Sequence, residues 1–185
     1  MISLVMDTSN RYLAVGLYQD NVRLEAFQEK GSRRQSEKAI PTLKEVLDRH
    51  HIALKDVNEM IITSGPGSYT GVRVAMTIAK TLAAVSNVKI KSVSSLAAYA
   101  GMNQALSVID ARGHKVFVGV YENGLPLMKE QVMTLEDFAQ LRAEYEDFEL
   151  VGEVGCLGLN EKECDLCANI YALGQMADPI KNVDL

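Results

Sequence analysis

The hydrophobic pattern changes its period several times within the first hundred residues. Short apolar or alternating stretches are typical of strands and fall at residues 2–6, 11–18 and 22–28. From Gln35 the apolar residues recur at helical spacing, which predicts an amphipathic helix. A strand, a long helix, a strand and a short helix are then expected over residues 59–64, 69–86, 88–93 and 94–100. The pattern therefore predicts a β-β-β-α-β-α-β-α lobe over residues 1–103.

The expected helix over residues 69–86 is apolar on two sides, and Ser68 or Thr70 is its expected N-cap. Small residues recur every fourth position at Gly71, Ala75, Ala79 and Ala83, and bulkier ones form a second face at Ile78, Leu82 and Val85. A helix that is apolar on both sides is packed on both sides. The small-residue stripe is typical of core packing, but the two-sided pattern also raises the hypothesis of an interface with another chain.

The second half of the chain repeats the beginning at a constant offset. Four residues of the first hairpin return 103 positions later, so that Asp7, Val15, Gly16 and Tyr18 match Asp110, Val118, Gly119 and Tyr121. This match, within the same hydrophobic pattern, indicates an internal duplication. The second copy, over residues 104–185, is reduced to a hairpin, a helix begun by Thr134, a strand near 148–151 and a helix near 161–176.

A duplicated α/β unit with an Asp in each first hairpin is the plan of the actin-like ATPase (ASKHA) fold. Proteins of that fold hold ATP in a cleft between two lobes, where oriented amides and carboxylates handle phosphate and metal. The corresponding residues here would be remnants of a phosphate site: Asp7, Thr8, Ser9, Gly65, Gly67, Ser68, Asp110 and Arg112. Because the second lobe is small and has no glycine loop of its own, we do not expect the chain alone to hydrolyse ATP.

Each of these motifs also has a purely structural interpretation. The spacing in Gly65–Gly71 is GxGxxxG, which is neither the dinucleotide fingerprint nor a Walker loop, so a turn with a partner contact is favoured over phosphate binding. Asp110 and Arg112 are expected to pair across their hairpin. Arg73 falls in the first turn of its helix, against the helix dipole, which indicates a carboxylate of this chain, a neighbouring subunit or an anion as its partner.

Charge is distributed unevenly along the chain. The net charge is −5, but residues 1–100 carry 13 Lys and Arg against 9 Asp and Glu, and the remainder carries 6 against 15. No carboxylate lies between Glu59 and Asp110, which indicates either a buried segment or a contact surface for an acidic partner. The apolar character of the segment favours burial. Neither a signal peptide nor an apolar run long enough for a membrane span is recognisable, so we expect a cytoplasmic protein.

The chemistry-bearing residue types form few constellations. Three cysteines, Cys156, Cys164 and Cys167, argue against a disulfide framework, and we favour reduced thiols over a zinc or redox site. The chain has only three histidines, and two of them, His50 and His51, are adjacent, so they would not face one metal easily. A peptidase triad or metal site cannot be assembled from them.

Three motifs carry a resemblance to a known family. Asp7-Thr8-Ser9, Gly65-Pro-Gly-Ser-Tyr-Thr-Gly-Val-Arg73 and Asp110-Ala-Arg112 resemble the TsaB (YeaZ) family, over residues 1 to about 125. The resemblance implies a non-catalytic subunit for threonylcarbamoyladenosine modification of tRNA. Such a subunit is thought to pair with the catalytic TsaD through helices of the first lobe, to be joined by the ATPase TsaE, to reach tRNA through the complex and to form a homodimer when alone.

Under that resemblance no cofactor is expected on this chain, since ATP and metal would belong to the partner subunits. Candidate interface residues are Ala39, Leu43, Leu47, Gly71, Arg73, Ala75, Ala79 and Ala83. The chain departs from the family at Gln35, where relatives usually carry His, and it ends at Leu185 without their closing Pro-x-Tyr-Leu-Arg-like segment. The alternative function is a small ATPase or phosphotransferase of the actin-like fold.

Overall fold

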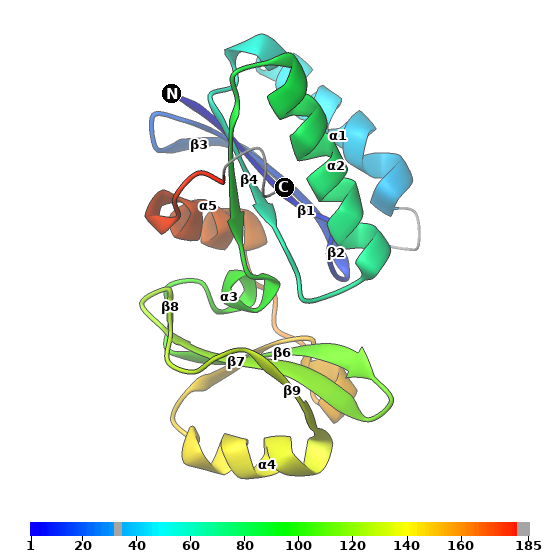
Figure 1. The fold of residues 1–185 in the computed structure, drawn as a ribbon, viewed down its shortest axis with the longest axis vertical. Coiled ribbons are helices and arrows are strands. Elements are labelled where there is room, and N and C mark those ends of the chain that lie inside the picture. The colour runs from blue at the N-terminus through cyan, green and yellow to red at the C-terminus, as the bar shows by residue number, and fades with distance from the viewer. Residues whose placement is uncertain (32–34, 181–185) are drawn as a thin grey trace.

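The computed structural model describes residues 1–31 and 35–180, which form two mixed sheets one above the other (Figure 1). The first sheet has the order β3-β2-β1-β4-β5. Its strands are β1 (Ile2–Asp7), β2 (Tyr12–Gln19), β3 (Val22–Lys30), β4 (Glu59–Thr63) and β5 (Lys89–Val93). The first three strands pair antiparallel, and β1, β4 and β5 pair in parallel. All three expected opening strands and both later ones are confirmed.

Helices cover both faces of this sheet. On one face lie α1 (Gln35–Arg49) and α2 (Tyr69–Val85), which pack on each other and on the sheet in one hydrophobic cluster. Pro41 lies inside α1, in the second turn. Ser68 is the N-cap of α2, as one of the two sequence alternatives had it, and its Oγ accepts a hydrogen bond from Gly71 N at 3.3 Å. The short helix α3 (Ser95–Ala100) follows β5 and is entirely buried.

The second sheet is smaller and has one long hairpin at its centre. Its strand order is β10-β6-β7-β8, and β9 also pairs with β7. The bounds are β6 (Ala105–Arg112), β7 (Lys115–Glu122), β8 (Leu125–Pro126), β9 (Gln131–Thr134) and β10 (Glu149–Gly152). Helix α4 (Leu135–Glu144) covers its outer face, and Thr134 is its N-cap, since its Oγ1 accepts a hydrogen bond from Asp137 N at 3.1 Å.

The repeated Val-Gly-x-Tyr motif has the same physical role in both hairpins. A Cβ on Gly16 would lie 3.1 Å from the ring of Tyr18, and a Cβ on Gly119 would lie 2.6 Å from the ring of Tyr121. In each strand the glycine lets the tyrosine two residues later lie across it, because residues i and i+2 share one face. Both rings are buried in the same cluster between the sheets. The fold is the duplicated α/β actin-like one that the sequence predicted, with a full first lobe and a reduced second lobe.

The last helix returns to the first sheet. Helix α5 (Leu166–Met176) packs against β1, β2, β3, β4, β5 and α3, although its residues follow the second sheet in sequence. At Gly174 the helix touches the sheet so closely that a Cβ there would lie 2.4 Å from the side chain of Ile61. One hydrophobic cluster therefore includes residues of both sheets, α3 and α5. The lobes share a core and are not two independent domains.

Helix α5 starts five residues later than the pattern predicted. Residues 161–165 are not helical, because their side chains are used elsewhere. Asp165 is the N-cap of α5, with Oδ1 accepting a hydrogen bond from Ala168 N at 2.9 Å, and Glu161 forms ion pairs with the first lobe. The departure from the family's Pro-x-Tyr-Leu-Arg-like closing segment falls on residues 181–185, which lie outside the described residues. Within the described ranges, no helix is long and apolar enough to cross a membrane.

Candidate functional site

The glycine loop of residues 65–71 is packed against the first hairpin. Thr8 Oγ1 donates a hydrogen bond to Gly71 O at 2.6 Å, and Ser68 N donates one to Ser9 O at 2.7 Å. A Cβ on Gly71 would lie 2.0 Å from Thr8 O, and one on Gly67 would lie 2.3 Å from Ser9 O. Two glycines of the motif are therefore needed for close backbone approach to the hairpin, and the loop's N–H groups at Ser68 and Gly71 are already bonded within the chain.

Asp7 organises the interior of the first lobe. Its Oδ1 accepts hydrogen bonds from Ser9 N at 2.8 Å, Ser9 Oγ at 2.6 Å and Thr63 Oγ1 at 2.5 Å. Ser9 Oγ also lies 2.8 Å from the hydroxyl of Ser95 in α3. The side chain is buried, and this burial raises the pKa of Asp7 above its usual value, against the opposing effect of the hydrogen bonds. Asp7, Thr8 and Ser9 thus form the turn that the structural interpretation expected.

A cleft of about 530 Å³ lies between the lobes, where actin-like ATPases hold their nucleotide. Its lining comes from the first hairpin, the glycine loop, the second hairpin and the segment after β10: Asn10, Arg11, Gly67, Ser68, Tyr69, Thr70, Asp110, Ala111, Arg112, Phe117 and Glu153. The structure thus brings five of the predicted remnant residues close to one cavity (Gly67, Ser68, Asp110 and Arg112 in the lining, Ser9 beside it). Asp7, Thr8 and Gly65 do not line it.

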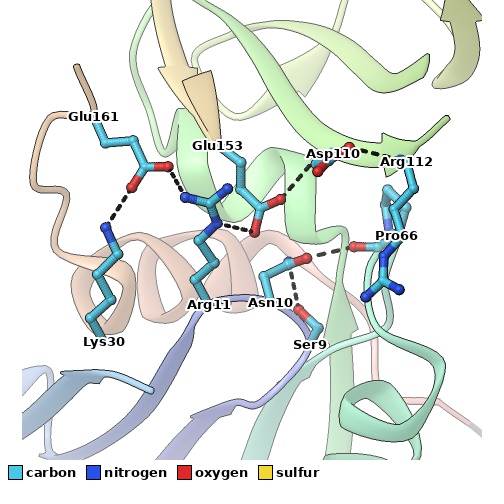
Figure 2. Close-up of polar contacts among 9 residues, drawn as sticks. All are labelled: Ser9, Asn10, Arg11, Lys30, Pro66, Asp110, Arg112, Glu153 and Glu161. Atoms are coloured by element: carbon cyan, nitrogen blue, oxygen red, sulfur yellow. Dashed lines mark hydrogen bonds and ion pairs between the residues drawn. The ribbon is translucent and has the colours of Figure 1, made fainter. Parts of the chain in front are cut away.

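Four charged residues join the two halves of the chain, of which Arg11 and Glu153 line the cleft and Lys30 and Glu161 lie beside it (Figure 2). Arg11 Nε lies 3.4 Å from Glu153 Oε1, and the same guanidinium forms an ion pair with Glu161. Glu161 also pairs with Lys30 Nζ at 2.7 Å. Glu153 is buried, which raises its pKa, while the N–H of Asp110 at 3.0 Å and Arg11 favour its charged form. At the wall of the cleft, the charges of Arg11 and Glu153 are therefore compensated within the chain.

The expected side-chain pairing of Asp110 with Arg112 is wrong. Asp110 Oδ1 accepts its hydrogen bond from the backbone N of Arg112 at 2.7 Å, and no ion pair between the two appears among the described residues. The reason is local: the strand register shifts between these residues and Arg112 adopts a φ of 63°. Asp110 is exposed, whereas its repeat partner Asp7 is buried.

Sequence reasoning did not identify the ion-pair residues Lys30, Arg11, Glu153 and Glu161. Arg11 and Glu161 are 150 positions apart, so no local pattern connects them. One signal was present at Glu153, which is a charged residue within the apolar stretch from Leu150 to Val154. A charged residue at a buried position is almost always paired.

The predicted interface residues lie mainly inside the chain. Five of them are buried in the cluster beneath α1 and α2, namely Ala39, Leu43, Leu47, Ala75 and Ala79. Their assignment to a partner surface is therefore wrong, since side chains that the chain itself covers cannot contact another molecule. Ala75 and Ala79 are buried together with Ile78 and Leu82 on the side of α2 that packs in this cluster. Gly71 and Ala83 are half-buried, and Arg73 alone of the set is exposed.

The exposed face of these two helices contains a groove of about 430 Å³. Its lining is largely apolar and comprises Ser36, Ile40, Tyr69, Thr70, Arg73, Val74, Thr77 and Ile78. Ile40 is 61% exposed and Tyr69 is 74% exposed, which is unusual for such residues on a helix pair. Arg73 Nη1 donates a hydrogen bond to Tyr69 Oη at 2.6 Å, and the guanidinium carbon lies 5.2 Å from the ring centroid.

The cysteines and histidines form no obvious reactive centre. All three cysteines are free, and burial raises the pKa of Cys164 to about 11 and that of Cys167 to about 12, so both are thiols at neutral pH. His50 Nε2 lies 2.8 Å from Glu25. Within residues 1–31 and 35–180 no three His, Cys, Asp or Glu residues are grouped so that they could hold a metal ion.

Fold and cleft together define a two-lobed actin-like protein in which Arg11 and Glu153, at the wall of the interlobe cleft, are bonded to each other. A solved structure titled YeaZ from Pseudomonas aeruginosa superposes with a TM-score of 0.79 at 22% identity, covering 95% of this chain and 91% of that chain. A further Pseudomonas aeruginosa structure, titled as an uncharacterized protein with similarity to peptidase YeaZ, has a TM-score of 0.81 at 23% identity and covers 95% and 90%. At such identities these likenesses show the fold.

Sequence comparison shows the family. The family model described as TsaD, tRNA N6-adenosine threonylcarbamoyltransferase, matches residues 28–170. The tRNA threonylcarbamoyladenosine biosynthesis protein TsaB of Bacillus subtilis is 31% identical over 78% of this chain and 67% of its own length. TsaB of Escherichia coli is 31% identical over 66% of this chain and 57% of its own length. The chain belongs to the TsaB (YeaZ) family, and it spans about 57 to 67% of the length of these relatives.

Proposed function

We propose that the chain is a non-catalytic scaffold subunit for threonylcarbamoyladenosine modification of tRNA in the cytoplasm. It pairs with a TsaD-like catalytic subunit, is joined by a TsaE-like ATPase and reaches tRNA through that complex. ATP and metal belong to the partner subunits. The names of its relatives place the family in this biosynthesis. The observation that carries the scaffold role is the exposed, largely apolar groove between α1 and α2.

The contacts at the wall of the cleft support the same proposal. An actin-like ATPase needs free amides and carboxylates around its nucleotide, whereas here Arg11, Glu153 and Glu161 are bonded to each other and the glycine loop is bonded to the first hairpin. Binding of ATP would have to replace these contacts. The groove, in contrast, presents apolar side chains that only another surface can cover, so the isolated chain is expected to form a homodimer.

The test is size-exclusion chromatography with light scattering, on the chain alone and mixed with the TsaD-like protein of the same cell. We expect a heterodimer to replace the homodimer. Ile40→Glu places a charge in the groove and should abolish this complex. Val85→Glu is the control, because Val85 is also exposed but lies at the C-terminal end of α2, outside the groove lining, and this variant should leave the complex intact. Equal behaviour of the two variants, or no wild-type complex, would refute the scaffold role.

The alternative is a small ATPase or phosphotransferase, and it rests on the 530 Å³ cleft between the lobes. It requires the purified chain to bind ATP with magnesium. Isothermal titration calorimetry at high protein concentration decides this: measurable binding that Glu153→Gln weakens would favour the alternative, and the absence of heat would exclude it.

A further inference from the structure

Among the described residues that line the groove between α1 and α2, one side chain is charged at neutral pH. This side chain is Arg73, and the described lining contains no carboxylate, Lys or His. Helix α2 has no acidic residue. Within the described part of the chain, no carboxylate lies within ion-pair distance of Arg73, and its recorded hydrogen bond goes to the neutral hydroxyl of Tyr69. The cation is thus held in place but not neutralised.

The position of Arg73 makes this arrangement unfavourable without a partner. The residue lies near the N-terminal end of α2, where the helix dipole favours negative charge and disfavours positive charge. A carboxylate placed beside Arg73 would be stabilised by both the guanidinium and the dipole. The ring of Tyr69 and the hydrogen bond at 2.6 Å fix the guanidinium, so little side-chain entropy remains to be lost when its remaining N–H groups bind two carboxylate oxygens.

We infer that this groove selects an acidic partner surface, in which a carboxylate among apolar side chains of a partner helix pairs with Arg73. The inference rests on the proposed function and names the chemistry that the partner must present. It also explains why a different chain fits better than a second copy. In an isologous dimer each groove meets the same lining, which brings one cation and no carboxylate to the contact.

A nucleic-acid phosphate is the other anion that Arg73 could meet, but the groove does not suit it. Nucleic-acid binding depends on several cations along a phosphate backbone. Here one arginine stands among Ile40, Val74 and Ile78, which is the composition of a protein–protein contact, where Tyr and Arg are the side chains that contribute most to affinity.

The experiment measures the dissociation constant for the TsaD-like protein by biolayer interferometry at 50 and 500 mM NaCl. Arg73→Glu should weaken binding by about 30-fold or more, as for other charge pairs covered by an interface, and Arg73→Lys should lose less. Salt should weaken the wild-type heteromer but not the Arg73→Gln variant. Lys55→Glu, the same charge change at an exposed position outside the groove, is the matched control and should bind as the wild type does.

A second probe separates this inference from the scaffold proposal. It is a designed amphipathic helical peptide with two glutamates on its apolar face, and its control has glutamine at both positions. The wild-type chain should bind the glutamate peptide at least several-fold more tightly, and Arg73→Glu should abolish that preference. If the TsaD-like protein does not bind but the peptide preference is found, the proposed function fails and the inference stands. Equal binding of both peptides would overturn the inference. So would a loss of affinity with Lys55→Glu as large as that with Arg73→Glu, or an Arg73→Glu defect that is found only in the binding of tRNA.

Discussion

Replacing Gly71 by Ala tests whether the glycine loop exists to pack on the first hairpin. Gly71 lies in the first turn of α2 and does not have a left-handed φ, so an alanine should adopt its conformation and raise helix propensity by up to about 1 kcal/mol. Its Cβ, however, would lie 2.0 Å from Thr8 O, which is carried by backbone and cannot rotate away. The two effects have opposite signs, so the sign of the measured change decides between them.

The magnitude follows from what must move. To relieve the clash, the start of α2 has to withdraw from the hairpin, which strains or breaks the 2.6 Å bond from Thr8 Oγ1 to Gly71 O and the 2.7 Å bond from Ser68 N to Ser9 O. Overpacking costs about 1–3 kcal/mol and each lost hydrogen bond about 1 kcal/mol. After the gain in helix propensity, we expect a net loss of about 2–4 kcal/mol in the free energy of unfolding.

The assay is urea unfolding followed by circular dichroism, with the midpoint and slope compared to those of the wild type. The control is Gly113→Ala, at a position with φ of 60° and no atom within 4 Å of the added Cβ, which measures backbone strain alone and should cost about 1–2 kcal/mol. A Gly71→Ala variant as stable as the wild type, or more stable, would show that the close approach is not a constraint, and phosphate binding would again have to explain the motif.

Three further predictions concern titratable groups at buried or half-buried positions. Burial raises the pKa of Asp7 in the folded protein above its value in the unfolded chain, so the wild type should lose stability as the pH rises through the folded pKa. The Asp7→Asn variant should lose this contribution to the pH dependence of the free energy of unfolding, measured by urea titrations from pH 4 to 8. The same pH dependence in the variant and the wild type would contradict the prediction. Lys91→Met should lower the free energy of unfolding by about 3–5 kcal/mol in the same assay, because the buried Glu59 carboxylate loses the ammonium group that now lies 3.1 Å away. A decrease of less than about 1 kcal/mol would contradict this. Lys89→Met, at an exposed position, is the control. Cys164 and Cys167, with pKa values of about 11 and 12, should react with iodoacetamide at pH 8 only after unfolding, as peptide mass spectrometry would show. Rapid alkylation of either of these two residues in the native protein would refute the prediction, whereas alkylation of Cys156 would not bear on it.

The parts of the fold that sequence predicted well are those that depend on local pattern. The five strands and three α-helices from β1 to α3 follow from changes in hydrophobic period, and the N-caps at Ser68 and Thr134 follow from side chains that bond the next turn. The duplication was recognisable because Gly16 and Gly119 meet the same steric demand, the tyrosine ring two residues later. Such steric constraints involve residues that are close in sequence, so they can be recognised from a short segment of the chain.

The parts that it missed depend on contacts between distant segments. Periodicity predicts two apolar faces on α2, but the buried side of the helix combines Ala75 and Ala79 of one predicted face with Ile78 and Leu82 of the other. The return of α5 to the first sheet depends on the approach of Gly174 to Ile61, more than a hundred positions earlier. In a local pattern, a glycine within a helix indicates only reduced helix propensity, although here it lets the helix pack closely on the sheet.

The two lobes are expected to move as one body, and this bears on how the chain would act as a scaffold. Opening the cleft would separate Arg11 from Glu153 and Glu161 and would also divide the hydrophobic cluster that α3 and α5 share with both sheets. Exposing that cluster costs far more than the ion pairs alone, because free energy scales with the apolar area returned to water. A hinge is of use to an enzyme that closes on its substrate. A docking surface gains from the opposite property, since a groove already in its bound shape loses little entropy when a partner covers it.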